Sequence, residues 1–313
     1  MNAITNSILF PMLITVFPIL LTYYRGEKST YFKIVIWSIL SLALSFTLFI
    51  VIKLDYNFII TIISILFSTI INIGLLKEWI DSKNFIRLVI VFLFFFFGSI
   101  FQLIPIWLFD LDIKNLTSSQ DVYLTLFSDS IILIVILFLY RKVLKEQFID
   151  FKKHLYEYLD TGFKYWLIGL IVMVISNLLI MGLSPNSIAT NEKQVQTLID
   201  GAPFVSLICI GLIAPIIEEF TFRKAFYDAF PKKWLFILSS GIVFGGLHVV
   251  LSLNSLWDLL YLIPYCSLGI SFAFIISKTK NIFPSILVHC FHNTCLTLLS
   301  ISSGIIGMVM MLW

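Results

Sequence analysis

Three short groups of polar residues, each inside or beside an apolar stretch, are the places where this chain could do chemistry. The first is Glu218-Glu219-Phe-Thr-Phe-Arg223. Glu219 and Arg223 are four residues apart, so on a helix they share one face and can pair. Glu218 points about 100° away around the helix and lacks that partner. We expect Arg223 to keep Glu219 ionised and Glu218, in a drier cavity, to suit a general base. The competing interpretation is a pair of interfacial carboxylates.

The other two groups supply histidines and a side-chain amide. One is Phe244-Gly-Gly-Leu-His248, whose glycines allow close approach of a backbone or a substrate. The other is His289-Cys-Phe-His292-Asn293. His289 and Asn293 share a helix face and could offer two hydrogen-bond donors to one oxygen, as an oxyanion hole requires. His292 lies off that face and is expected to contact a neighbouring helix. Taken singly, each group is also explained by hydrogen bonding between helices.

Taken together, a base candidate, a histidine and a donor pair are the parts needed for attack of water on an amide bond. The elements that must position them are membrane helices. The chain is 59% hydrophobic and 12% charged, with a mean hydropathy of +1.01, whereas soluble domains are about 25% charged. The residues before the first apolar run lack the features of a cleavable signal peptide, so we expect that run to remain as a span.

The fold class predicted is all-α, a polytopic transmembrane helix bundle of about ten spans. Apolar stretches of roughly 17 to 25 residues, the length that crosses a hydrocarbon core, recur along the chain. The last stretch is long enough for one span or for a span and a re-entrant piece. The predicted spans are residues 5–23, 34–52, 58–76, 88–108, 124–140, 166–183, 204–222, 235–251, 257–276 and 283–311.

The basic residues indicate how the chain is oriented. Eighteen of its 21 Lys and Arg residues fall in alternate connections between these spans, and short cytoplasmic loops carry the excess of basic residues. This pattern predicts a multi-pass protein of the cell membrane with its N-terminus outside. The active site is then expected towards the cytoplasmic half of the lipid bilayer. A net charge of +3 is too small to indicate a nucleic-acid partner.

Two parts of the chain differ in where their charges lie. Residues 1–165 are predicted to form N-terminal transmembrane helices, and residues 166–313 a protease-like core, because ionisable residues gather within apolar segments only in the second part. The connector from Arg141 to Tyr165 alternates apolar and basic residues at helical spacing. That pattern is typical of an amphipathic helix on the cytoplasmic membrane surface, or of a solvated connector with one apolar face.

At the three polar groups the sequence resembles the CPBP family of CAAX-protease and bacteriocin-processing intramembrane proteases, which includes the type II CAAX prenyl endopeptidases. The family's signatures are Glu-Glu-x-x-x-Arg, Phe-x-x-x-His and His-x-x-x-Asn/Asp, in that order on separate helices. All three are present, in that order, within roughly residues 165 to 300. One departure is Lys224, where the family usually has glycine. The first five spans carry no matching motif.

The resemblance implies a role for each motif residue. Glu218 and His248 would activate water, and His289 and Asn293 would stabilise the oxyanion. The supporting residues would be Glu219, Arg223 and Phe244. No cofactor is expected. Zinc is conceivable from the residue types, but the sequence lacks the His-Glu-x-x-His motif, so we favour a metal-free mechanism.

The substrate implied is a membrane-embedded or lipidated peptide or protein, whose identity the sequence does not give. Two alternatives from other classes stay open. One is a noncatalytic membrane binding protein of the bacteriocin-immunity type. The other is a secondary transporter, although matched broken helices in two halves are not seen. Retention of Glu218 favours the protease, since binding alone needs no general base.

Overall fold

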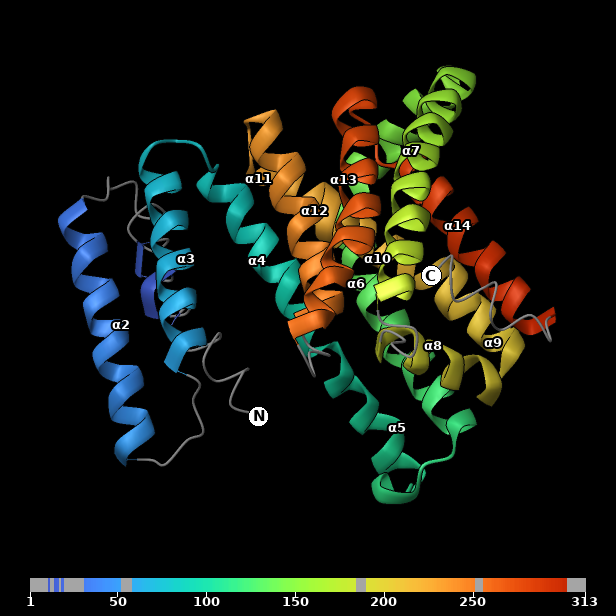
Figure 1. Cartoon of the computed structure of the whole chain (residues 1–313), viewed down its shortest axis with the longest axis horizontal. Helices are drawn as coiled ribbons and strands as arrows, with labels where there is room; N and C mark the ends of the chain where they lie inside the picture. The colour runs from blue at the N-terminus through green and yellow to red at the C-terminus, as the bar shows by residue number, and fades with distance from the viewer. Residues whose placement is uncertain are drawn as a thin grey trace. The chain divides into compact units, whose positions relative to one another are not determined.

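A computed structural model of the chain describes residues 11, 14–16, 18–19, 31–51, 58–183, 190–250 and 256–302. In these residues the secondary structure is helical and contains no strand, so the predicted all-α class is confirmed (Figure 1). The helices are α2 Tyr31–Val51, α3 Phe58–Leu76, α4 Ser82–Phe97, α5 Leu103–Leu108, α6 Ser118–Lys153, α7 Leu155–Leu183, α8 Thr190–Gly201, α9 Pro203–Ile208, α10 Ala214–Glu218, α11 Ala225–Ala229, α12 Lys233–Val250, α13 Leu262–Thr279 and α14 Phe283–Ser302.

Shorter irregular helices join these elements. The 3₁₀ segments are η1 Gly98–Gln102, η2 Ile113–Asn115 and η5 Leu256–Tyr261. Two segments are π-helices, η3 Cys209–Ile213 and η4 Glu219–Lys224. π-Turns inside α-helices are rare and often lie at functional sites. Here they interrupt the stretch that carries Glu218 and Glu219.

The predicted number of ten spans is not confirmed. Within the described residues, six helical stretches are long and apolar enough to cross a membrane, namely Ser82–Leu108, Ser118–Lys153, Leu155–Gly182, Pro203–Ala229, Leu259–Thr279 and Phe283–Ser302. Shorter apolar helices occur at Lys33–Ala43, Ser64–Leu76 and Lys233–Val249. Most of the predicted span 5–23, and the stretch after residue 302, lie outside the described residues. The chain is nevertheless a multi-pass membrane protein.

The chain divides into two compact units. One comprises Met1–Arg87 with Asp228–Lys232, and the other comprises Leu88–Tyr227 with Lys233–Trp313. Within the first unit, Ser38 of α2 hydrogen-bonds to Thr69 of α3 at 2.8 Å. The three polar motifs all lie in the second unit. The predicted boundary at residue 165 stays a prediction.

Helix α6 extends beyond the length of a bilayer. It begins with a capping box in which Thr117 and Gln120 satisfy each other's backbone N–H groups. Its 36 residues measure about 54 Å, against about 30 Å for a hydrocarbon core. The connector from Arg141 is helical but is not a helix of its own: its first half continues α6, and a turn at His154 leads directly into α7. Its place on the membrane surface stays a prediction.

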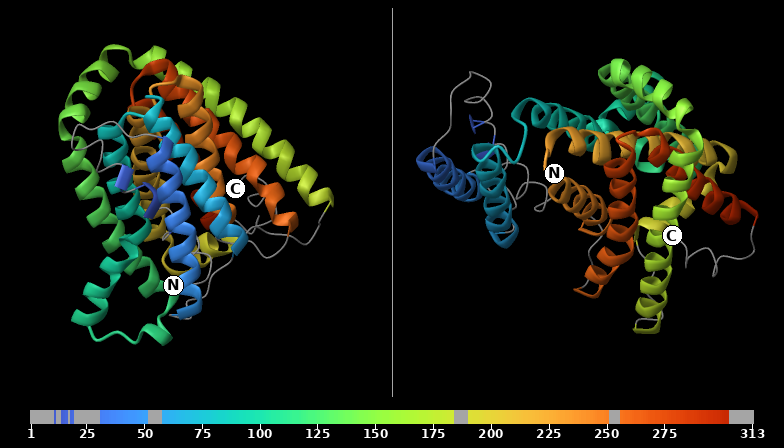
Figure 2. Two further views of the ribbon diagram at one scale, coloured as in Figure 1. Left: turned by 90° about the vertical axis from the view of Figure 1, so that its left-hand side faces the viewer. Right: turned by 90° about the horizontal axis from the view of Figure 1, so that it is seen from above.

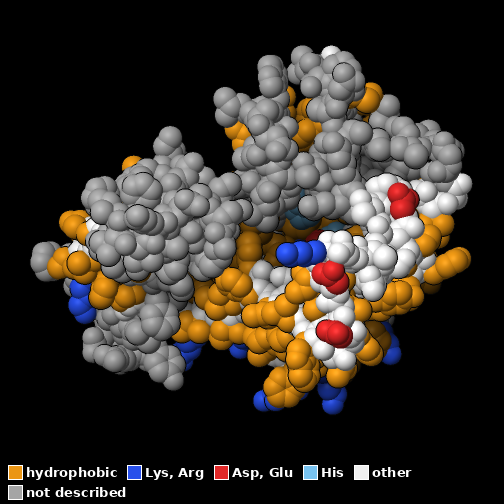
Figure 3. Space-filling model, turned by 90° about the horizontal axis from the view of Figure 1, so that it is seen from below, with side chains coloured by type: hydrophobic (Ala, Val, Ile, Leu, Met, Phe, Trp, Pro, Cys, Tyr) orange, Lys and Arg blue, Asp and Glu red, His pale blue; other side chains and the backbone are white. Residues whose placement is uncertain are grey.

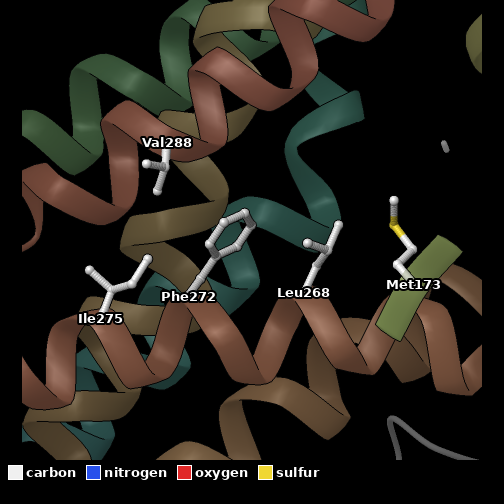
Figure 4. Close-up of a cluster of buried hydrophobic side chains, with 5 residues drawn as sticks. All are labelled: Met173, Leu268, Phe272, Ile275 and Val288. Atoms are coloured by element: carbon white, nitrogen blue, oxygen red, sulfur yellow. The ribbon is translucent and has the colours of Figure 1, made fainter. Parts of the chain in front are cut away.

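In the second unit, α13 lies between α12 and α7, as the views in Figures 1 and 2 agree. A buried apolar cluster joins α13 to α7 and α14 (Figure 4). Phe272 of this cluster is fully buried and also packs against the candidate site. The members of the cluster are Met173, Leu268, Phe272, Ile275 and Val288.

The outward faces of several helices are apolar. Ile134 and Phe138 of α6 and Leu179 of α7 are each more than 60% exposed. Hydrophobic side chains also make up most of what the described residues show in the view of Figure 3. In a soluble protein such contiguous apolar surface is rare. These faces suit contact with lipid.

Close packing of α12 on α13 depends on glycine. A Cβ atom at Gly245 would lie 2.5 Å from the Cys266 Sγ atom and 2.7 Å from the Cys266 backbone nitrogen. At the next residue, Gly246, a Cβ atom would meet nothing within 4 Å. The two neighbouring glycines therefore differ: Gly245 sets the separation of the helices and Gly246 does not.

We expect Gly245→Ala to destabilise the protein by about 1–3 kcal/mol, because the clash is with backbone atoms that cannot rotate away. Gly246→Ala is the matched control, and it should be neutral or slightly stabilising because alanine favours helix. Thermal unfolding of the purified proteins in one detergent measures both. Equal melting temperatures for the two variants would contradict this account of the α12–α13 contact.

Candidate active site

The first polar motif lies where α10 passes into the π-turn η4. Glu218 is the last residue of α10, and Glu219 begins η4. A π-turn changes the usual i to i+4 hydrogen bonding of the backbone, and side chains of neighbouring helices bond to carbonyl groups in both π-turns. Ser240 of α12 donates to the Phe222 carbonyl oxygen at 2.6 Å. Thr294 of α14 donates to the Gly211 carbonyl oxygen at 3.3 Å.

Glu219 is fully buried and has three partners. Its Oε1 atom lies 3.3 Å from the Arg223 Nε atom and 2.9 Å from the His289 Nδ1 atom. Its Oε2 atom accepts a hydrogen bond from the Ser285 hydroxyl group. The predicted pairing of Glu219 with Arg223 is therefore present. A buried carboxylate is costly unless it is paired and hydrogen-bonded, and this one is both.

Arg223 is held between two aromatic rings. Its guanidinium carbon lies 4.1 Å from the centroid of the Phe244 ring and 5.3 Å from that of Phe272. The side chain is fully buried, so these cation–π contacts are made without competing water. Phe244, the first residue of the second motif, therefore packs directly against the Arg223 guanidinium.

His289 connects the two glutamates. Its Nδ1 atom faces Glu219, and its Nε2 atom lies 3.6 Å from the Glu218 Oε2 atom. Its ring stacks on Phe272, with centroids 4.6 Å apart. Because the near contact is to a carboxylate, we assign the Nδ1 hydrogen to the bond with Glu219. The Nε2 atom then points towards Glu218.

Glu218 differs from its neighbour in being accessible. Its side chain is 17% exposed, whereas that of Glu219 is 0% exposed. It lines a cavity of about 230 Å³ formed by residues of α4, η1, α6 and α10. Five other polar residues share the lining with it, namely Ser99, Gln102, Thr125, Ser128 and Asp129. Water and a polar substrate group can thus reach Glu218 and not Glu219.

His248 adjoins the site through Phe244. The two rings have centroids 4.5 Å apart, and Phe244 also lies edge-on to His289 at 6.2 Å. The His248 Nδ1 atom lies 2.8 Å from the Phe244 carbonyl oxygen, and its ring stacks on Tyr265. His248 thus lies against Phe244, which also contacts His289 and Arg223.

Asn293 lies one turn beyond His289 on α14. Its Nδ2 atom donates to the Ile210 carbonyl oxygen of η3 at 3.1 Å. An amide nitrogen has two hydrogens, so the second remains for another acceptor. His292, by contrast, is buried and packs edge-on against Trp166 of α7 at 6.2 Å. This matches the expectation that His292 contacts a neighbouring helix.

Three residues of this site were missed from the sequence. Ser285 could have been found, because it precedes His289 by four residues and so shares its face. Phe272 could not have been singled out, since a phenylalanine in an apolar helix is expected to belong to the hydrophobic core. Asp129 stands alone within the predicted span 124–140, before the part of the chain in which ionisable residues gather, and it lines the same cavity as Glu218.

The donor atoms do not form an evident metal site. Over the part of the chain that the structure describes, no three His, Cys, Asp or Glu side chains are grouped as metal ligands. The Glu219 carboxylate in particular is already engaged by Arg223, His289 and Ser285. The metal-free mechanism stays a prediction.

Comparison with known families assigns part of the chain. Residues 200–295 match the family model described as Type II CAAX prenyl endopeptidase Rce1-like. The chain carries an Rce1-like segment. All three polar motifs lie inside it, so the resemblance to CPBP proteases is confirmed over this stretch. The residues of α6 that line the Glu218 cavity precede residue 200, so they lie outside the Rce1-like segment.

Individual relatives match at low identity. The chain is 30% identical over 119 residues to the Bacillus subtilis (strain 168) protein named "Putative membrane peptidase YdiL", covering 36% of this chain and 46% of that protein. It is 30% identical over 109 residues to the UPF0177 protein YaiF of Lactococcus lactis subsp. lactis (strain IL1403), covering 34% and 46%. The chain therefore spans about half the length of these curated relatives. No solved structure matches the chain.

Proposed function

We propose that the protein is an intramembrane endopeptidase that hydrolyses a peptide bond in a membrane-associated protein or peptide. One observation carries the proposal: two adjacent glutamates contact opposite nitrogens of His289, at 2.9 and 3.6 Å, and only Glu218 faces a cavity. Such an arrangement separates a buried supporting carboxylate from an accessible one. The accessible carboxylate is placed as a general base must be.

The reaction would begin with a water molecule beside Glu218. Glu218 takes a proton from the water as its oxygen bonds to the carbonyl carbon of the scissile peptide. The carbonyl oxygen becomes an oxyanion, which accepts hydrogen bonds from His289, as an imidazolium with a hydrogen on Nε2 as well as on Nδ1, and from the Asn293 Nδ2 group. Glu218 then gives its proton to the departing nitrogen as the carbon–nitrogen bond breaks. The proton returns to the product amine, so the base is regenerated.

The remaining residues would hold this arrangement in place. Glu219 fixes the orientation of the His289 ring, and Arg223 offsets the charge of Glu219. Preorganised donors of this kind need no rearrangement during the reaction. His248, in the role that the family resemblance implies, would orient the attacking water together with Glu218.

The substrate would reach this site within the bilayer. A membrane-embedded or lipidated peptide or protein fits a catalytic group inside an apolar helix bundle. The distribution of basic residues supports an N-terminus outside and a site towards the cytoplasmic half of the cell membrane. No nucleic-acid partner and no cofactor are included in the proposal.

The test compares membrane peptidomes of cells that contain the wild type or Glu218→Gln at equal abundance. Glutamine keeps the shape of the side chain but cannot accept the proton. Fragments found with the wild type should disappear in the variant, and their ends identify the cleaved bond. If the two peptidomes agree while a phenotype of the wild type persists in the variant, the protein acts by binding and the protease proposal fails.

A further inference from the structure

The cavity beside Glu218 has a polar wall that the proposed chemistry does not use. Ser99 and Gln102 of the α4–η1 stretch face residues of α6 across it, and Gln102 lies 3.5 Å from the Ser128 hydroxyl. The lining also has apolar residues, with Phe95, Phe96 and Ile132 among them. A cavity lined by both polar and apolar side chains suits a group that has both characters, such as an alkyl chain that ends in a polar head.

The charge of the wall determines which head it would favour. Asp129 lies inside an apolar span, where a carboxylate is costly and function is the default explanation. Within the described residues, Asp129 accepts no hydrogen bond from another protein group, and its carboxylate is close enough to Glu218 for their charges to interact. Glu218 and Asp129 are the acidic residues of the described lining, which includes no Lys, Arg or His.

We infer that the cavity is a substrate subsite that binds a cationic group, and that Asp129 determines this specificity. The group would be an ammonium or guanidinium on an aliphatic stem: the stem lies along the phenylalanines, and the head pairs with Asp129. A cavity of about 230 Å³ is below the range of pockets for whole drug-sized ligands, so it accommodates one side chain or chain end. Two parts of a peptide have this chemistry, a Lys or Arg side chain and a free amino terminus.

The inference rests on the proposed function, because it assigns a subsite to the same active site. It also reaches beyond the Rce1-like segment, since Asp129 lies before residue 200. The carboxylate would act on substrate choice and not on the chemical step. Asp129→Asn should therefore change which peptides are cleaved, lowering the cleavage of cationic peptides more than that of uncharged ones.

The first experiment measures binding without catalysis. n-Butylammonium is the probe, and 1-butanol is its neutral counterpart of similar size. The melting temperature of the purified wild type in detergent should rise with millimolar n-butylammonium and not with 1-butanol, at ionic strength held constant with NaCl. The rise should be lost in Asp129→Asn and kept in Asp121→Asn, a matched control on an exposed residue of the same helix. Equal responses of wild type and Asp129→Asn overturn the inference.

The second experiment uses a peptide that spans a bond cleaved only by the wild type. Four versions are compared, with Lys or norleucine in the residues flanking the bond and with a free or acetylated amino terminus. The wild type should favour one cationic version by about 10- to 100-fold in kcat/KM, and Asp129→Asn should reduce that preference to about 1. The peptide version that the wild type favours and Asp129→Asn does not identifies whether the cavity binds a side chain or the amino terminus. Equal cleavage of all versions by the wild type overturns the inference.

The two proposals can fail separately. If peptidomes of the wild type and Glu218→Gln agree, the protease proposal fails, whereas selective binding of n-butylammonium would still support a cation site at Asp129. If cleavage depends on Glu218 but neither experiment shows selection for a cation, the protease stands and the subsite is refuted.

Discussion

His289→Ala is expected to lower kcat/KM for a cleaved peptide by about 10²- to 10⁴-fold, with most of the loss in kcat. The substitution removes one proposed donor to the oxyanion, and losing a single donor of this kind costs about 10²–10³ in rate. It also removes the imidazole ring that lies between Glu218 and Glu219, so Glu218, the proposed general base, loses its contact with His289. Glu219 keeps Arg223 and Ser285 as partners, and we therefore expect the variant to fold.

The control is His292→Ala on the same helix. Both histidines are buried, but His292 packs against Trp166 and the described contacts do not link it to the glutamates. Its truncation should lower stability by leaving a cavity, while kcat per folded molecule stays near the wild-type value. The measurement is a steady-state rate normalised to folded protein. Equal losses of kcat in both variants would show that the effect is structural and would contradict the assignment of His289.

Arg223→Met is expected to destabilise the protein by about 3–5 kcal/mol. Arg223 and Glu219 are both fully buried and form an ion pair at 3.3 Å. Removing one partner of a buried pair leaves an uncompensated charge, which is the costly step, whereas replacing both with neutral groups of similar size is often tolerated. The double variant Glu219→Gln/Arg223→Met should therefore recover most of the lost stability.

The double-mutant cycle compares the wild type, Glu219→Gln, Arg223→Met and the double variant. Their stabilities are measured in one detergent, by protease resistance or by melting temperature. Arg223→Lys is a useful fifth measurement, because lysine keeps the charge but lacks the planar group that fits between Phe244 and Phe272. It should fall between the wild type and Arg223→Met. A double variant as unstable as Arg223→Met would show that the guanidinium acts through packing alone. Activity should be lost in the double variant, because glutamine cannot hold the His289 ring as Glu219 does.

The class of protein and the identity of the motif residues followed from the sequence alone, because both depend on local pattern. A run of apolar residues must form a helix in lipid, where the backbone cannot leave its hydrogen bonds unsatisfied. An i to i+4 spacing brings Glu219 to Arg223 whatever surrounds them. For the same reason it could be predicted that His292 lies off the face of His289 and contacts a neighbouring helix. The exact number of spans could not be predicted. Length and hydropathy do not determine whether shorter apolar helices such as α12 cross the membrane.

The arrangement between helices was decided only by the tertiary structure. His289 lies 70 residues from Glu219 in the chain, and no spacing rule predicts that one glutamate binds Nδ1 while its neighbour faces Nε2. The two π-turns depend on side chains of α12 and α14 that bond to their carbonyl groups, which is a long-range effect. Asp129 was not among the residues predicted from the sequence, and only the packing of α6 shows that it lines the Glu218 cavity. Local sequence determined which residues are polar within the membrane, and packing determined which of them share one site.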